Sequence, residues 1–99
     1  MNEKVMPQKI DAEQSVLGAM FLSKTALEKA VESLNKDMFY LDAHKKIFEV
    51  MKNLDDKKVP IDITTVTNEL EEKKLLNQIG GVAYLTEIVN VVPTAANVD

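Results

Sequence analysis

A chain of 99 residues is the size of one domain and can bury about two-thirds of the surface of its unfolded state. It contains no cysteine, which excludes a disulfide framework and a thiolate metal site. Its twelve basic residues are all lysines and are outnumbered by sixteen acids, giving a net charge of −4. Because a surface that grips DNA phosphates needs clustered basic residues, we expect no direct DNA binding and a protein as the partner.

The N-terminal part of the chain predicts an arm followed by a first helix. Residues 1–9 show no hydrophobic periodicity and contain Pro7, which indicates a mobile arm. Asp11 is well placed to cap a helix over residues 11–22, because its side chain can accept a hydrogen bond from a free N–H of the first turn. The apolar residues predicted to face inward from this helix are Ala12, Val16, Leu17, Met20 and Phe21.

Two further helices and a turn are predicted in the middle of the chain. Thr25 and Glu28 have the spacing of a capping box, which predicts a helix over residues 25–35. Asp42 is predicted to cap the longest helix, over residues 42–54. The turn between these helices is predicted to place three side chains in the core, namely Met38, Phe39 and Tyr40.

A fourth helix is predicted to start after Asp62, which is again a good N-cap. Residues 59–61 before it should be extended, since Val59 precedes Pro60. The helix is predicted to close at residues 71–74, where two acids precede two lysines at a spacing that supports side-chain pairing. Its predicted inward positions are Ile63, Val66 and Leu70.

A short apolar helix over residues 82–92 is framed by glycine and proline. Gly80 and Gly81 can adopt positive φ angles, so they can end one element and start the next. Pro93 lacks an N–H and should end the helix, and residues 94–99 are interpreted as the start of another. The predicted apolar stripe consists of Val82, Leu85, Ile88, Val89 and Val92. We assign purely architectural roles to four residues, namely Gly80, Gly81, Pro93 and Asn97.

These patterns together predict an all-α fold, a compact orthogonal bundle of about six short helices with residues 10–93 as its globular head. No run of residues is long enough to span a membrane, and the start of the chain lacks the apolar core of a signal peptide. Residues at which alanine should cost about 2–5 kcal/mol of stability are Leu17, Phe39, Ile47, Phe48, Leu70 and Leu85.

The sequence offers no catalytic, cofactor-binding or metal-binding set of residues. His44 is the only histidine, and a lone histidine lacks the partners of a metal site, so a structural or surface role is expected. The adjacent acids at residues 55–56 and 71–72 point in different directions, which favours solvated charge over a carboxylate dyad. The chain has three glycines and no Gly-Lys-Ser or Gly-Lys-Thr, so we expect no P-loop and no ATPase activity.

Three blocks of the sequence resemble the N-terminal domain of the bacterial and phage replicative DNA helicases, the DnaB-like family. The first is Asp-Ala-Glu-Gln-Ser-Val-Leu-Gly at residues 11–18. The second combines Asp-Met-Phe-Tyr at residues 37–40 with His-Lys-Lys-Ile-Phe at residues 44–48. The third, at residues 80–98, contains Gly-Gly, Tyr-Leu and Val-Pro-Thr-Ala-Ala-Asn. The resemblance covers residues 7–99 in the expected order.

The resemblance implies a non-catalytic head that forms a collar on a hexameric ring, assembled as a trimer of dimers. It implies contacts with other helicase subunits, with the helicase-binding domain of primase and with a helicase loader, all in the cytoplasm. ATP and Mg²⁺ would be held by a separate RecA-like motor domain that follows a helical hairpin, so no cofactor is expected here. Because the resemblance stops where the hairpin would begin, we expect the head alone to be a monomer or a weak dimer.

Four residues are candidates for partner contacts, namely Tyr84, Asp11, Glu13 and Glu87. Tyr84 lies at the edge of the last apolar stripe, where its ring could anchor an interface or could cover the core with its hydroxyl in water. Asp11 and Glu13 are expected to be exposed acids at a helix N-terminus. They could meet a basic primase surface, or simply cap the helix and complement its dipole.

Two other interpretations of the sequence remain open. The helicase-binding domain of primase has a related helical fold, although the Glu-Gln-Ser-Val-Leu-Gly and Pro-Thr-Ala-Ala-Asn signatures favour the helicase. A helical DNA-binding module of the helix-turn-helix type would need a basic recognition helix. Neither the helix after Asp42 nor the helix after Asp62 is markedly basic.

Overall fold

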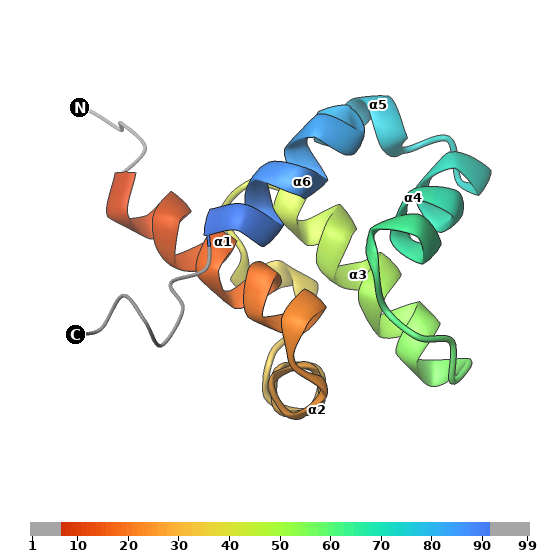
Figure 1. Cartoon of the computed structure of the whole chain (residues 1–99). Coiled ribbons are helices and arrows are strands. Elements are labelled where there is room, and N and C mark those ends of the chain that lie inside the picture. Colours follow the sequence, from red (N-terminus) through yellow and green to blue (C-terminus); the bar gives the residue numbers. More distant parts are fainter. Residues whose placement is uncertain (1–6, 92–99) are drawn as a thin grey trace.

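Every regular element in the computed structural model, which describes residues 7–91, is helical (Figure 1). This confirms the all-α prediction. Six α-helices and one 3-10 turn follow one another along this part of the chain. They are α1 (Pro7–Leu22), α2 (Lys24–Ser33), the 3-10 turn η1 (Lys36–Met38), α3 (Asp42–Asp56), α4 (Ile63–Glu72), α5 (Leu76–Ile79) and α6 (Gly81–Val91).

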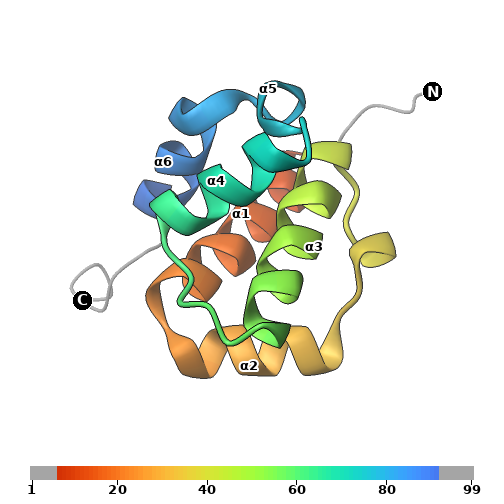
Figure 2. The ribbon, with the colours of Figure 1, turned by 90° about the vertical axis from the view of Figure 1, so that its right-hand side faces the viewer.

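The helices cross one another steeply and surround α3. Figure 2 shows α2 running across the foot of the bundle, crosswise to α3. The first and last helices, α1 and α6, pack against each other, while α4 packs against α3. The two ends of the described chain therefore meet in one contact, and α5 links α4 to α6 over the opposite end of the bundle (Figure 1).

The core is aliphatic and is centred on α3, which has the clearest amphipathic pattern. Of the residues predicted to be core, Leu17, Ile47, Phe48, Leu70 and Leu85 are completely buried and Phe39 is nearly so, which confirms that prediction. The other buried hydrophobic residues are Met20, Leu27, Ala30, Val50, Met51, Leu54, Val66, Ile79 and Ile88.

The start of α1 differs from the prediction. The helix begins at Pro7, so residues 7–9 are helical and Asp11 lies inside the helix instead of capping it. Proline is well suited to a first helical turn, because its fixed φ is helical and its missing N–H would have no partner there. This preference overrides the cap signal of Asp11. At 16 residues α1 is also longer than α3, which has 15, so the longest described helix is not the one predicted.

Of the four predicted helix caps, one is right and three are wrong, the first of these being Asp11. Asp62 caps α4, and its side chain and that of Thr65 form a reciprocal capping box. The N-cap of α2 is Ser23, whose hydroxyl accepts a hydrogen bond from the N–H of Ala26, so the predicted Thr25–Glu28 box is wrong. Asp42 is the first residue of α3, and its N-cap Leu41 makes no side-chain capping bond.

Several residues predicted to face inward are exposed. Met38 and Tyr40 are 59% and 49% exposed, and only Phe39 of that turn enters the core. The tight 3-10 turn sends successive side chains in different directions, so three neighbours cannot all be buried. Ala12 and Val82 also lie on outer faces of their helices.

Gly80 and Gly81 form the predicted break between helices. Both have positive φ angles, of 105° and 75°, and Gly80 ends α5 while Gly81 starts α6. A Cβ atom on Gly80 would lie 2.9 Å from the Cβ of Tyr84, so this position also requires the close approach that only glycine allows. The predictions for the arm before Pro7 and for Val92, Pro93, Asn97 and residues 94–99 fall outside the described residues.

Two lysines adopt a backbone conformation that usually belongs to glycine. Lys58 and Lys74 have φ angles of 65° and 61°, and each directly follows the C-cap residue of its helix, α3 or α4. At both ends the next residue donates its N–H five residues back, from Val59 to Leu54 and from Leu75 to Leu70. This is the Schellman motif, in which the left-handed residue lets the last carbonyls of a helix find donors.

Replacing either lysine by glycine is therefore expected to stabilise the fold. The left-handed conformation costs a residue with a Cβ about 1 kcal/mol, and Lys58→Gly or Lys74→Gly should recover much of it. Urea unfolding of each variant measures the gain. Lys52→Gly inside α3 is the control with the opposite sign, since glycine within a helix should cost about 1 kcal/mol.

Candidate functional site

A network of four polar side chains lies buried where α1, α3 and α6 meet. One oxygen of the Glu13 carboxylate on α1 is 2.6 Å from Nδ1 of His44 on α3. The other ring nitrogen of His44, Nε2, is 2.6 Å from the hydroxyl of Tyr84 on α6. That hydroxyl also accepts a hydrogen bond of 3.0 Å from the side-chain amide of Gln14. His44 is completely buried, Glu13 and Gln14 are 8% exposed, and Tyr84 is half-buried.

When the His44 imidazole is neutral, the chemistry of the four groups gives each hydrogen bond a direction. An ionised carboxylate can only accept, so Nδ1 of His44 carries a proton and donates a hydrogen bond to Glu13. Nε2 of a neutral imidazole then accepts from the hydroxyl of Tyr84, whose free lone pair accepts from the amide of Gln14. When Nδ1 carries the proton, both ring nitrogens of His44 and the hydroxyl of Tyr84 are therefore hydrogen-bonded.

Glu13 also anchors the chain just before α3. Its carboxylate accepts hydrogen bonds from the backbone N–H groups of Tyr40 and Leu41, at the end of the 3-10 turn. One side chain of α1 therefore holds both the entry to α3 and the imidazole on its first turn. The ring of Phe39 closes the site from the same turn, with its centroid 6.5 Å from that of His44.

The network shifts the pKa of Glu13 and Tyr84 in opposite directions. Burial raises the pKa of Glu13, but the hydrogen bonds from His44, Tyr40 and Leu41 outweigh burial and lower it overall. Burial also raises the pKa of the Tyr84 phenol, and the negative charges of Glu87 and Glu13 raise it further against the hydrogen bond from Gln14. Glu13 is thus kept ionised, and Tyr84 is kept protonated.

The order carboxylate, imidazole and hydroxyl is also that of a hydrolase triad, but this network lacks the chemistry of a triad. An activated nucleophile needs a hydroxyl that loses its proton readily, and here the pKa of Tyr84 is raised. Its hydroxyl is already held between His44 and Gln14. The described residues also contain no group of three or more His, Asp and Glu side chains that could hold a metal ion. The arrangement is that of a structural network.

Acid is expected to remove the stabilisation that Glu13 provides. Because the pKa of Glu13 is lowered from 4.5 on folding, the contribution is complete above that value and is lost as the pH falls through the folded-state pKa. Urea unfolding of the wild type and of Glu13→Gln, at neutral pH and at successively lower pH, measures the effect. The stability difference between the two proteins should shrink below pH 4.5, and a difference that does not change with pH would contradict this assignment.

The four predicted contact residues fall into two groups. Asp11 and Glu87 are exposed, as expected. Glu13 was predicted to be exposed and is instead buried, with its carboxylate bound to His44 and to the backbone N–H groups of Tyr40 and Leu41. The hydroxyl of Tyr84 points into the network and away from water.

Sequence reasoning missed the roles of His44 and Gln14. The partners of His44 are 31 and 40 residues away along the chain, and Gln14 contacts a residue 70 positions away. Local patterns carry no signal of such contacts. The only hint is that all four network residues fall inside the three blocks quoted for the family resemblance.

The surface next to the network has an apolar hollow of about 160 Å³. Its lining comes from α1, from the end of α2 and from the 3-10 turn, and consists of Ala12, Glu13, Val16, Leu34, Met38 and Phe39. The exposed side chain of Met38 forms part of its wall. We call this surface the Met38 hollow. An exposed apolar hollow of this kind can receive a side chain of a protein partner.

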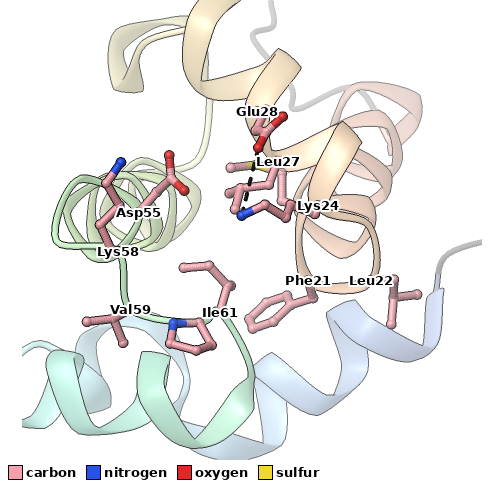
Figure 3. Close-up of a pocket in the computed structure, with 11 residues that line it drawn as sticks. Phe21, Leu22, Lys24, Leu27, Glu28, Asp55, Lys58, Val59 and Ile61 are labelled. Carbon is pink, nitrogen blue, oxygen red and sulfur yellow. Dashed lines mark ion pairs between the residues drawn. The ribbon is translucent and has the colours of Figure 1, made fainter.

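A larger cleft of about 430 Å³ lies between the corner of α1 and α2 and the loop from α3 to α4. Figure 3 shows Phe21 pointing towards the loop that carries Ile61, with charged residues at the opposite side of the cleft. Lys24 and Glu28 form an ion pair of 3.8 Å there. The other two charged residues that line the cleft, Asp55 and Lys58, also balance, so the cleft favours neither an anion nor a cation.

A small helical head whose buried polar groups bind one another, and whose exposed features are apolar and acidic, has the character of a protein-contact domain. The family model of the DnaB-like helicase N terminal domain matches residues 5–99, so the chain belongs to the DnaB-like helicase N-terminal domain family. This confirms the family resemblance and decides against the primase domain and the helix-turn-helix module.

Named relatives agree with this assignment. The replicative DNA helicase DnaC of Bacillus subtilis (strain 168) is 50% identical over 99 residues, which are all of this chain and 22% of that protein. The replicative DNA helicase DnaB of Geobacillus stearothermophilus is 50% identical over 98 residues, 99% of this chain and again 22% of that protein. The chain thus spans about a fifth of the length of these curated relatives.

A solved structure shares the fold. The crystal structure of the N-terminal domain of DnaB helicase from Mycobacterium tuberculosis superposes with a TM-score of 0.82 at 43% sequence identity. The match covers 89% of this chain and 61% of that one. No helix among residues 7–91 is long and apolar enough to cross a membrane.

Proposed function

We propose that this chain acts in DNA replication as the non-catalytic head of a replicative DNA helicase. In this role it is part of the collar and oligomerisation scaffold of a hexameric ring, in the cytoplasm, and a docking site for primase. The observation that carries the proposal is that the titratable groups of the central network bind one another, while the apolar Met38 hollow stays open at the surface. Such a domain works through contacts and not through chemistry.

Helicase activity belongs, in this proposal, to the longer protein of which the head is a part. Its relatives of known name are replicative DNA helicases about five times as long as the matched region. ATP and Mg²⁺ would be bound by the RecA-like motor domain of that protein, and a helicase loader would act on the assembled ring. The head contributes geometry and a binding surface.

The Met38 hollow is the proposed site for the helicase-binding domain of primase. An apolar side chain of primase would enter the hollow, and Asp11, an exposed acid on α1, would favour a basic neighbour on the partner. Glu87 on α6 is a second exposed acid that could meet such a surface. Of the original candidates, Glu13 and Tyr84 take part indirectly, because they hold α1 and the 3-10 turn in place.

Calorimetric titration with the helicase-binding domain of the cognate primase tests the docking role. We expect measurable binding, and a loss of at least about fivefold in affinity for Met38→Ala, which is the change that a central interface residue typically causes. Leu22→Ala is the matched control, since Leu22 is as exposed as Met38 but lies at the other end of α1. Equal binding by both variants would place the primase contact elsewhere, and no binding by the folded wild type would leave the head with the collar role alone.

Sedimentation tests the expected oligomeric state of the 99-residue chain. Its described surface shows scattered exposed apolar residues and one small apolar hollow, so we expect a monomer or a weak dimer at micromolar concentration. A tight hexamer formed by this chain alone would contradict the view that ring assembly needs further parts of the helicase.

A further inference from the structure

His44 is a completely buried titratable group that the contact function does not use. Both of its ring nitrogens have a partner at 2.6 Å, the carboxylate of Glu13 on one side and the hydroxyl of Tyr84 on the other. Behind Tyr84, the amide of Gln14 lies 3.0 Å from the same hydroxyl. An amide group can donate from its nitrogen or accept at its oxygen, so this end of the chain of hydrogen bonds can be reversed.

When His44 is neutral, each group in the network donates to the next, from Gln14 through Tyr84 and His44 to Glu13. Gln14 donates to Tyr84, Tyr84 donates to Nε2 of His44, and Nδ1 of His44 donates to Glu13. If His44 takes up a proton, Nε2 must also donate, and the hydroxyl of Tyr84 loses its acceptor. A rotation of the Gln14 amide by about half a turn places its oxygen at the hydroxyl, and Tyr84 can then donate to it.

The groups around His44 can accommodate both the neutral imidazole and the imidazolium. Glu13 faces the ring from α1 and forms an ion pair with the imidazolium, while Tyr84, with Glu87 nearby, faces it from α6. From the turn before α3 the neighbours are the apolar ring of Phe39 and backbone N–H groups, which bind Glu13 and not the imidazole. Lys45, the next residue along α3, is the nearest cation in sequence.

We infer that Gln14 is a proton-linked switch, whose side-chain amide turns over when His44 takes up a proton. The proton goes to Nε2 of His44, the hydrogen bond between His44 and Tyr84 reverses, and the bond between Tyr84 and Gln14 reverses with it. No hydrogen bond is lost and no helix has to move. The buried site between α1, α3 and α6 can therefore hold His44 in either charge state, and the Gln14 amide donates to Tyr84 in the neutral state and accepts from it in the charged state.

Nitrogen-15 NMR of the 99-residue chain across a pH titration tests this inference. At the high-pH end His44 is expected to be the tautomer protonated at Nδ1. As His44 becomes an imidazolium, the side-chain amide signals of Gln14 should shift in the same pH step. A tautomer protonated at Nε2, or a Gln14 amide that does not follow His44, would overturn the inference.

The variant Gln14→Met provides a second test of the same inference. Methionine keeps the length of the side chain but removes the acceptor that the charged state needs, so proton binding by His44 should weaken about tenfold, a fall of about one pH unit in its midpoint. Gln78→Met is the control, since Gln78 is an exposed glutamine on α5 and its replacement should leave the midpoint unchanged. An unchanged midpoint in Gln14→Met would also overturn the inference, and the wild-type titration decides the matter if that variant does not fold.

Discussion

Glu13→Ala is expected to lower the free energy of unfolding by about 3 kcal/mol at neutral pH. The substitution removes the acceptor of three donors at once, which are Nδ1 of His44 and the N–H groups of Tyr40 and Leu41. Removing one partner of a buried pair is costly, because the completely buried His44 then has no water within reach to replace the carboxylate. The loss should therefore far exceed that of an ordinary surface carboxylate.

Urea unfolding followed by circular dichroism measures this loss. Glu87→Ala is the matched control, because Glu87 is an exposed acid on the neighbouring helix α6 and should change stability by no more than about 0.5 kcal/mol. Similar losses in the two variants would show that the carboxylate of Glu13 is solvated and that the network does not support the fold.

Phe48→Ala should cost about 3–5 kcal/mol, because it opens a cavity at the centre of the bundle. The ring of Phe48 is completely buried on α3 and lies 5.2 Å, centre to centre, from the ring of Phe39. The helices packed around α3 can close only part of the space that the ring leaves. A loss of this size could abolish the folded state, since a small domain is stable by only about 5–15 kcal/mol.

The midpoint of thermal unfolding, together with urea unfolding, measures the effect of Phe48→Ala. Met38→Ala is the control, because Met38 is an exposed apolar residue and its loss should cost less than about 0.5 kcal/mol. If Phe48→Ala were as stable as this control, the core would be centred elsewhere in the bundle.

The fold was predictable because its determinants are local and repeat along the helices. The apolar spacing that places Ile47, Phe48 and Leu54 on one face of α3 is visible in the sequence and is enough to identify the core. Helix starts were harder to predict, because several residues compete for each cap. Ser23 prevailed over Thr25, and Pro7 started α1 ahead of Asp11.

The polar network could not have been predicted in the same way. Glu13 looks like any acid near a helix start, and its burial depends on His44, which follows 31 residues later. Tyr84 was correctly placed at the edge of an apolar stripe, but the direction of its hydroxyl depends on α1 and α3 packing on the same side of α6. The structure thus gives a physical role to four polar residues of the family blocks, which meet in one buried site and are Glu13, Gln14, His44 and Tyr84.

A double-mutant cycle between Glu13 and His44 tests most directly whether this site is a single structural unit. Free energies of unfolding would be measured for Glu13→Ala, His44→Ala and the double variant. Because each residue is buried against the other at 2.6 Å, the double variant should be more stable than the sum of the single losses predicts, by about 2 kcal/mol. Losses that add to within about 0.5 kcal/mol would contradict the network, because they would show that the two side chains stabilise the head independently.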